Sequence, residues 1–171
     1  ELNKRGCNVA VVPYNTKAQD ILSLNPDGIM LSNGPGDPKE NVEAIEELKK
    51  LFGNVPIFAI CLGHQLLALS QGGETTKLKY GHRGVNQPVK NLETGRTYIS
   101  SQNHGYAVVN EEIEKTGAKV SYINANDSTC EGVDYPGKNA FSVQFHPEAC
   151  SGPHDTRFIF DKFIEMMGGN K

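Results

Sequence analysis

The sequence of 171 residues lacks any apolar run near the roughly 18 residues that a membrane-spanning helix needs. It also lacks clustered basic residues, because its 17 lysines and arginines are spread along a chain of net charge −3. This distribution does not favour a nucleic-acid or anionic-membrane surface. The first residues, Glu1 to Arg5, contain no apolar signal-peptide segment. We therefore expect neither a membrane nor a nucleic acid as a partner.

The chain also has little cysteine, and its four cysteines lack the spacing of a disulfide framework (Cys7, Cys61, Cys130 and Cys150). In a domain that can bury its own core, such cysteines indicate reduced thiols and a cytoplasmic protein. A zinc site could be drawn from Cys61, His64, His146 and Cys150, but the paired spacing of common structural zinc sites is absent. The sequence therefore predicts no metal site.

Hydrophobic residues make up 37% of the chain, which suits one compact domain with a single core. The chain opens without methionine on residues that resemble the end of a helix. We therefore interpret residues 1–171 as one domain of a longer protein, from which a strand before Leu2 is missing.

Buried strands and amphipathic helices alternate through the first half of the chain. Apolar runs predict strands over residues 9–13, 28–32 and 56–60. Helical spacing of apolar residues predicts helices over 18–24, 42–52 and 62–70. Strands that are apolar throughout and separated by helices indicate a parallel sheet covered on both faces.

The second half changes to short strands with Gly or Asn between them, predicted over 75–80, 87–92, 96–101, 106–109 and 119–124. This pattern favours an antiparallel addition to the sheet. A buried strand returns over 140–146, and an amphipathic helix follows over 155–167. The predicted fold is α/β, with one doubly wound, mostly parallel sheet, a small antiparallel addition and a missing first strand.

Cys61 lies where the strand over 56–60 runs into the helix over 62–70 with almost no loop. This arrangement is typical of a nucleophile elbow, which presents one side chain at the carboxyl edge of a sheet. The turn is tight, so it needs small residues two before and two after the nucleophile, and these are Ala59 and Gly63. The helix N-terminus favours a thiolate by only about 0.3–1 kcal/mol. A nucleophilic Cys61 therefore needs a base partner. The alternative is an ordinary buried core cysteine at a strand end.

His146-Pro147-Glu148 follows the last predicted strand and offers that base. Pro147 favours an extended conformation at His146. Residues i and i+2 of an extended segment project to the same side, so Glu148 can reach the imidazole. A carboxylate there fixes the histidine tautomer and stabilises the imidazolium. The alternative is a solvated His-Pro turn with an incidental glutamate.

Acyl transfer also needs donors for a tetrahedral oxyanion. Gly34-Pro35-Gly36 follows another strand end, where glycine lets the backbone approach a substrate closely. The backbone N–H of Leu62, first in the elbow helix, is the natural donor, with that of Gly34 opposite. The alternative is a rigid turn. A phosphate loop is excluded because no Gly-Lys-Ser/Thr follows.

These residues carry a family resemblance. The chain resembles class I (triad) glutamine amidotransferases along nearly its whole length, and most closely those of carbamoyl-phosphate synthetase small subunits. The matching segments are 31–38, 60–69, 101–107, 144–148 and 151–155. The markers over 77–88, 102–105 and 152–155 are more like carbamoyl-phosphate synthetase than like the guanylate, cytidylate or anthranilate enzymes.

The resemblance implies that Cys61 attacks the side-chain amide of glutamine and that His146, supported by Glu148, protonates the departing ammonia. It implies a substrate site made of Gly34, Gly36, Leu62, Gln65, Asn103, Gly105 and Tyr106. We expect His64 and His104 to be structural. Two departures from the family pattern are Ala59, where glycine is usual, and Tyr106, where phenylalanine is usual; neither should disturb the site. A third is that the N-terminal domain of the family's small subunits, which the resemblance implies contributes to the glutamine site, is absent here along with the first strand of the sheet.

The resemblance further implies partners and chemistry outside the chain. A large synthetase subunit would use the ammonia, with ATP and Mg²⁺ that it binds itself, to make carbamoyl phosphate from bicarbonate for arginine and pyrimidine biosynthesis. This domain would need no cofactor. Two other hypotheses remain: a Cys-His peptidase or γ-glutamyl hydrolase, and a non-catalytic subunit that only holds its partner.

Overall fold

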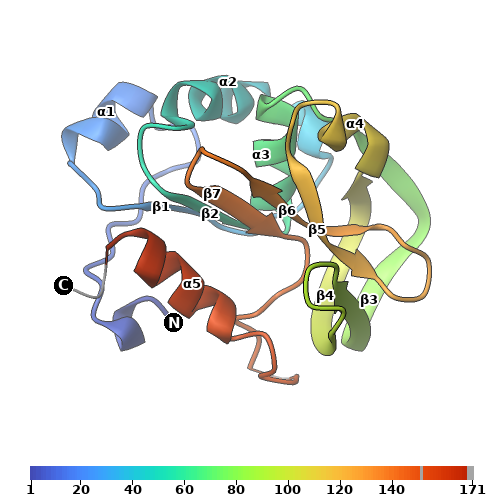
Figure 1. The fold of residues 1–171 in the computed structure, drawn as a ribbon. Coiled ribbons are helices and arrows are strands. Elements are labelled where there is room, and N and C mark those ends of the chain that lie inside the picture. The colour runs from blue at the N-terminus through green and yellow to red at the C-terminus, as the bar shows by residue number, and fades with distance from the viewer. Residues whose placement is uncertain (151, 169–171) are drawn as a thin grey trace.

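The computed structural model describes residues 1–150 and 152–168 as an α/β domain with helices on both faces of one sheet (Figure 1). Ser151, the first residue of the matching segment over 151–155, lies outside the described residues. Within them the sheet has seven strands in the order β1-β2-β7-β6-β5-β3-β4. The predicted α/β class is therefore confirmed, and the sheet is mixed.

Three apolar strands form the parallel part of the sheet: β1 (Ile29–Leu31), β2 (Ile57–Ile60) and β7 (Ala140–Val143). All residues of β2 and β7 are buried, as expected for strands covered on both faces. Leu31 pairs with Ala59, and Ile60 with Val143. The three strands therefore end at one carboxyl edge, which receives the loops of the candidate site.

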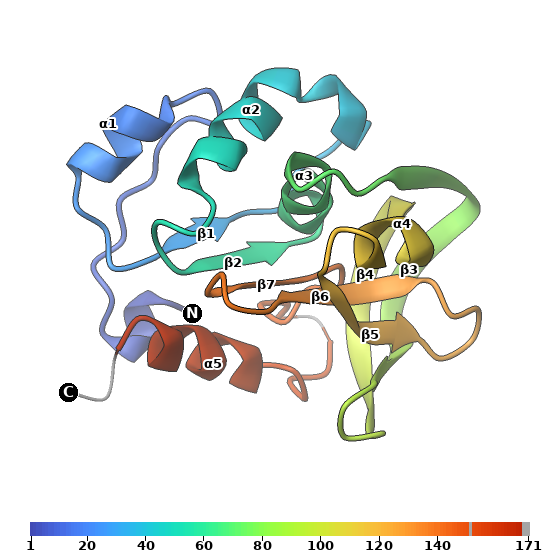
Figure 2. The same ribbon diagram turned by 45° about the horizontal axis from the view of Figure 1, so that its top comes forward.

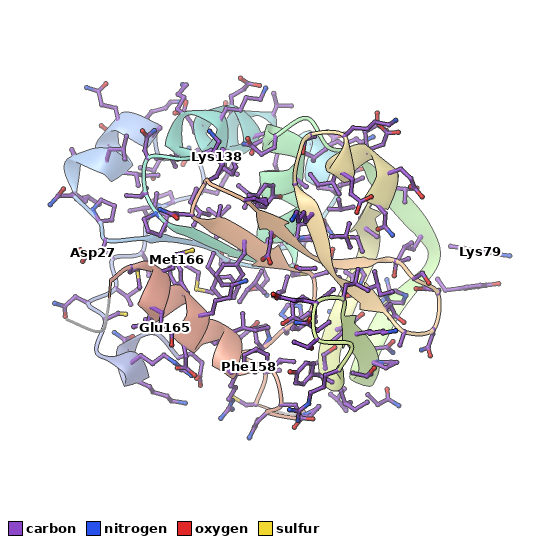
Figure 3. All side chains as sticks on the ribbon, in the orientation of Figure 1. Asp27, Lys79, Lys138, Phe158, Glu165 and Met166 are labelled. Atoms are coloured by element: carbon purple, nitrogen blue, oxygen red, sulfur yellow. The ribbon has the colours of Figure 1, made fainter. Side chains whose placement is uncertain are left out.

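The antiparallel part is larger than the sequence predicted. It holds β6 (Cys130–Tyr135), β5 (Lys119–Asn124), β3 (Thr75–Asn91) and β4 (Thr97–Val108). Four of the predicted short strands merge into the long β3–β4 hairpin, which two register shifts bend. Lys79 on β3 points away from the body of the domain (Figure 3). Strand β6 was not predicted, because its polar sequence does not alternate although most of it is buried.

Helices α1 (Ala18–Ser23), α2 (Val42–Leu51) and α3 (Leu62–Ser70) lie on one face of the sheet, and α5 (Phe158–Met166) lies on the other (Figure 2). A short helix, α4 (Asn110–Glu114), follows β4, and two 3-10 turns span Asn3–Arg5 and Pro38–Glu40. Among the described residues, no helix is long and apolar enough to cross a membrane.

Aromatic side chains fix α5 to the sheet. Phe160 and Phe163 are 1% exposed and pack on Phe58 of β2, with ring centroids 5.5 and 5.7 Å apart. Phe58 also stacks on Phe141 of β7 at 4.7 Å. Each such pair contributes about 0.5–1.5 kcal/mol beyond area burial. This packing holds β2 and β7 side by side directly below the site.

The predicted strand over 9–13 is not formed, and that prediction was wrong. Residues 7–13 are irregular, and Val11 is 91% exposed. A β-branched run forms a strand only where another strand offers backbone partners, and β1 is the edge of the described sheet on this side. The further strand expected before Leu2 stays a prediction.

Candidate active site

Cys61 is the single residue between the end of β2 at Ile60 and the start of α3 at Leu62. Its backbone has φ 54° and ψ −108°, a conformation that L residues rarely adopt. Strained backbone of this kind costs about 1–3 kcal/mol and is concentrated at functional sites. The Cys61 N–H donates to the Val143 carbonyl at 2.9 Å, which ties the turn to β7. The predicted elbow geometry is present.

Small residues make this turn possible. A Cβ on Gly63 would lie 2.6 Å from the Leu31 carbonyl oxygen and 2.7 Å from the Leu31 Cβ. Ala59 is fully buried in β2, opposite Leu31 in the parallel ladder. The elbow helix therefore packs directly on the backbone of β1, and the sequence prediction of small residues at both positions has a steric cause.

His146 and Glu148 form a pair beside Cys61. The His146 Nδ1 lies 2.7 Å from the Glu148 Oε1. The predicted contact is present, but the backbone reaches it through a turn, in which the Ala149 N–H donates to the His146 carbonyl at 3.3 Å, rather than through an extended segment. The His146 N–H donates to the Ser101 carbonyl at 2.9 Å, which holds the base against β4.

The environment of His146 favours its charged form. Burial alone would lower the pKa of the imidazole, but hydrogen bonds with Cys61 and Glu148 outweigh burial and raise this pKa to about 10. With Nδ1 committed to Glu148, Nε2 is the nitrogen that can exchange a proton with the Cys61 sulfur. The three side chains thus have the order of a nucleophile, a base and an orienting carboxylate.

A cavity of about 480 Å³ opens in front of Cys61 and His146. It is lined by the loop after β1 and by the middle of β4, so both halves of the sheet contribute to it. Six of the predicted substrate residues line it: Gly34, Gly36, Gln65, Asn103, Gly105 and Tyr106. Leu62 and Glu148 are not among the lining residues. For Leu62 the prediction concerned only its backbone N–H, which has no acceptor within the first turn of a helix.

Gln65 connects the elbow helix to the pocket wall. Its Nε2 donates to the Tyr106 carbonyl at 2.9 Å and to the Gln144 Oε1 at 2.7 Å. Both amide hydrogens are therefore used within the protein, and Oε1 is the atom available to a ligand. The Tyr106 contact involves only its backbone, as expected for a position where phenylalanine is usual.

The opposite wall is the loop after β1. Gly36 has φ 97°, a left-handed conformation that glycine adopts without strain. Asp37 caps the following 3-10 turn by accepting from the Lys39 N–H at 3.0 Å. The same carboxylate raises the pKa of the Tyr106 phenol by accepting its hydrogen bond. The loop therefore lies across the pocket from β4.

Comparison of the chain with known proteins identifies its family. The model of the family described as class-I glutamine amidotransferase matches residues 1–166. The chain belongs to the class-I glutamine amidotransferase family. The family assignment made from the sequence is confirmed.

Curated relatives of this amidotransferase chain include carbamoyl phosphate synthase small chains. It is 59% identical over 167 residues to that of Bacillus cereus, which covers 98% of this chain and 46% of the relative. It is 55% identical over 171 residues to that of Listeria monocytogenes, which covers 100% of this chain and 47% of the relative. The chain therefore spans about half the length of the curated relatives it matches.

Solved structures show the same amidotransferase fold. A Thermoplasma acidophilum protein described as part of a GMP synthase superimposes with a TM-score of 0.82 at 22% identity, covering 98% of this chain and 85% of that one. The glutaminase domain of Trypanosoma brucei CTPS with bound acivicin gives a TM-score of 0.65 at 19% identity, covering 90% and 75%. At these identities the likeness concerns the fold alone.

Sequence reasoning missed part of the amidotransferase pocket. Arg83, Asn33, Pro35 and His104 also line it. Arg83 pairs with Asn103 across the β3–β4 ladder, and only knowledge of that register could have placed it there. His64 is fully buried against the Ser142 hydroxyl at 2.8 Å, and burial lowers its pKa to about 3. This neutral, enclosed histidine fits the structural role expected for it.

Proposed function

We propose that residues 1–171 form a glutaminase domain in which Cys61, His146 and Glu148 are catalytic. The observation that carries the proposal is the arrangement of three side chains: a cysteine on a strained elbow, a histidine that lines the same cavity, and a carboxylate 2.7 Å from that histidine. The side-chain amide of L-glutamine is the substrate, in keeping with the family.

The first half of the reaction forms a thioester. The Cys61 thiolate attacks the amide carbon of glutamine, and the carbonyl oxygen becomes an oxyanion bound by the N–H groups of Leu62 and Gly34. The His146 imidazolium gives its Nε2 proton to the amide nitrogen as the C–N bond breaks, and ammonia leaves. Glu148 stabilises the imidazolium before this transfer and fixes its orientation throughout.

The second half releases glutamate. Neutral His146 now accepts a proton from water, and the resulting hydroxide attacks the thioester carbon. The carbon–sulfur bond breaks, Cys61 leaves as the thiolate, and His146 is again an imidazolium. No redox or metal chemistry enters these steps, and this domain needs no cofactor for them.

The cavity walls would hold the amino-acid end of the substrate. Backbone groups of Gly34, Gly36 and Gly105 can approach it closely, while Gln65 Oε1 and Asn103 can bond its ammonium and carboxylate groups. Arg83 brings a guanidinium to the same cavity, and we assign it the α-carboxylate of glutamine.

The relatives suggest the destination of the ammonia. We propose that the chain is the glutaminase domain of a cytoplasmic carbamoyl phosphate synthase small chain. Its partner would be the large subunit, which would bind ATP and Mg²⁺ and form carbamoyl phosphate from bicarbonate for arginine and pyrimidine biosynthesis. The identity of 59% to the Bacillus cereus small chain supports this assignment.

Glutamine labelled with ¹⁵N at the amide tests both parts. The chain is incubated with labelled glutamine alone. The full-length small chain that carries these residues is then incubated with labelled glutamine, a bacterial large subunit, ATP and bicarbonate, and glutamate, ammonia and carbamoyl phosphate are measured. We expect slow glutamate release from the chain alone that requires Cys61, release faster by orders of magnitude in the full complex, and ¹⁵N in carbamoyl phosphate when the large subunit is present. Glutamate release unchanged in Cys61→Ser would refute the catalytic assignment. Hydrolysis without transfer of ¹⁵N would refute only the assignment of the partner.

A further inference from the structure

Four polar side chains converge beside the pocket where β3, β4 and β6 come together. His82 lies on β3, Gln102 and His104 on β4, and Glu131 on β6. The His82 Nδ1 lies 3.2 Å from the His104 Nε2 and 3.1 Å from the Glu131 Oε1. The His104 Nε2 lies 3.6 Å from the same Glu131 oxygen and 3.1 Å from the Gln102 Oε1. The proposed reaction uses none of these groups.

Hydrogen bonds on the outside of this cluster fix which atoms face its centre. His104 Nδ1 faces the Tyr106 carbonyl at 2.8 Å, so Nδ1 carries the hydrogen and Nε2 of the neutral ring carries a lone pair. The Ser100 hydroxyl donates to the Gln87 carbonyl at 3.0 Å, so it accepts from the Gln102 Nε2 at 3.2 Å. Gln102 Oε1 therefore faces His104. Two acceptor atoms oppose each other with no hydrogen between them.

The other two groups add negative charge and a further lone pair. His82 Nε2 donates to the Asp127 Oδ2 at 2.8 Å, which leaves Nδ1 to face the centre. The Glu131 side chain is fully buried, and its Oε2 has no hydrogen-bond partner among the described residues. A buried carboxylate costs several kcal/mol unless a cation compensates it.

A single proton does not satisfy this arrangement. A proton on His82 Nδ1 would donate a hydrogen bond to Glu131. It would leave the His104 Nε2 and the Gln102 Oε1 as two acceptors that face each other without a hydrogen. Protonating His104 as well would place two N–H donors head to head across the 3.2 Å between the rings.

We propose that His82, Gln102, His104 and Glu131 bind a divalent transition-metal ion, with Zn²⁺ as the best fit. Zinc bonds to nitrogen and oxygen of about 2.0–2.2 Å in a tetrahedron separate the ligand atoms by roughly 3.3–3.6 Å. Four of the six separations among these donor atoms are 3.1–3.6 Å, close to that spacing. Imidazole ligands favour zinc, copper, iron or nickel over Mg²⁺ or Ca²⁺.

The surroundings of the two histidines fit the same role. A metal-bound histidine usually donates its other ring N–H to a carboxylate or a carbonyl. His82 donates to Asp127, and His104 donates to the Tyr106 carbonyl, both at 2.8 Å. The ion would reverse the expectation of no metal site, which considered only groups close in sequence or near Cys61.

Such an ion would join the pocket wall to the sheet. His104 lines the pocket and lies between Asn103 and Gly105, while Glu131 belongs to β6, which pairs with β7. The ion would hold the middle of β4 in one position relative to β7. This consequence for glutamine binding rests on the proposed function, whereas the binding of the ion does not.

Cobalt titration tests the site without an activity assay. Because Cys61, His146 and the exposed Cys150 could themselves bind a metal, the titration uses a Cys61→Ser/Cys150→Ser protein freed of metal with a chelator. We expect one Co²⁺ per chain, visible absorption typical of tetrahedral cobalt without a thiolate charge-transfer band, displacement by Zn²⁺, and a higher melting temperature with Zn²⁺.

Variants locate the ion. In the same background, His82→Asn and Glu131→Gln should each weaken Co²⁺ binding by about 100-fold or more, since changes to outer partners alone cost 10–100-fold. His154→Asn, in the segment before α5, is the matched control and should bind as the background does. Absence of binding by the folded background protein, or equal binding by all variants, overturns the proposal.

Nuclear magnetic resonance tests the proposed metal site in the folded background protein, so the result does not depend on whether the variants fold. In the folded background protein labelled with ¹⁵N-histidine, Zn²⁺ must shift the Nδ1 signal of one ring and the Nε2 signal of another. Imidazole signals that follow pH but not Zn²⁺ would show that protons alone occupy the cluster, and the proposal would be wrong.

Discussion

Replacement of Gly63 by alanine should have two opposite effects on stability: alanine favours the helix, but its Cβ clashes with β1. Whether the free energy of unfolding rises or falls therefore tests the steric description of the elbow. Alanine is favoured over glycine in a helix by up to about 1 kcal/mol. The added Cβ would however lie 2.6 Å from the Leu31 carbonyl oxygen, about 0.8 Å inside the 3.4 Å where ordinary contact begins. Since the obstacle is the backbone of β1, a side-chain rotation cannot relieve it, and α3 must move.

The movement sets the magnitude. Overpacking of a core costs about 1–3 kcal/mol, which exceeds the gain in helix propensity, so we expect a net loss of about 1–2 kcal/mol in the free energy of unfolding. Cys61 is joined directly to this helix, and displacement of a reacting group by about 1 Å costs about 10² in rate. Gly63→Ala should therefore fold but release glutamate roughly 100-fold more slowly.

Urea denaturation and steady-state glutamate release measure the two effects. Ala59→Gly is the control, because it changes the other small residue of the elbow in the opposite direction and adds no atom. We expect it to lose about 1 kcal/mol of stability and to retain most of its rate. A Gly63→Ala protein with the urea midpoint and rate of the wild type would refute the steric account.

Four further predictions concern the site. A diazo-ketone analogue of glutamine should label Cys61 and not Cys7, Cys150 or the buried Cys130, whose pKa burial raises; peptide mapping that finds the label on Cys150 would contradict this. His146→Ala should lose roughly 10–100 times more glutaminase rate than Glu148→Ala, because the histidine transfers the proton and the glutamate orients it; equal losses would show that the roles are not divided in this way. The pKa of His146 is raised to about 10, so its charged form persists below that value and kcat/KM should fall as pH rises through it; in Glu148→Gln the fall should begin at lower pH, and an unchanged profile would remove the ion pair from the mechanism. Arg83→Gln should raise KM for glutamine about fivefold with little change in kcat, as expected for an exposed ion pair worth about 1 kcal/mol; a change confined to kcat would place Arg83 elsewhere in the reaction.

Local patterns predicted the parts of the site that depend on neighbouring residues. The elbow at Cys61 requires only a strand, a helix and small flanking residues, and all lie within a few positions. The contact between His146 and Glu148 is also local, so it is present although the backbone turns where an extended segment was predicted.

Features that depend on which strands pair could not be predicted from the sequence alone. Arg83 lines the pocket because it pairs with Asn103 across the β3–β4 ladder. The cluster around Glu131 depends on β6, a buried strand that could not be predicted because its sequence is polar and does not alternate. Residues 9–13 show the opposite error, since their β-branched side chains favour a strand but the described residues provide no partner.

The parallel and antiparallel parts of the sheet contribute different groups to the site, and hydrogen bonds connect the two parts. The parallel strands β2 and β7 carry the nucleophile and the base, while β4 carries the wall with Asn103 and Tyr106. The His146 N–H donates to the Ser101 carbonyl on β4, and Gln65 of the elbow helix donates to the Tyr106 carbonyl. Because the pocket wall belongs to β4 and His146 is hydrogen-bonded to the same strand, a displacement of β4 would move both the wall and the base. Changes confined to the elbow should therefore act on kcat, whereas changes that shift β4 should alter kcat and KM together.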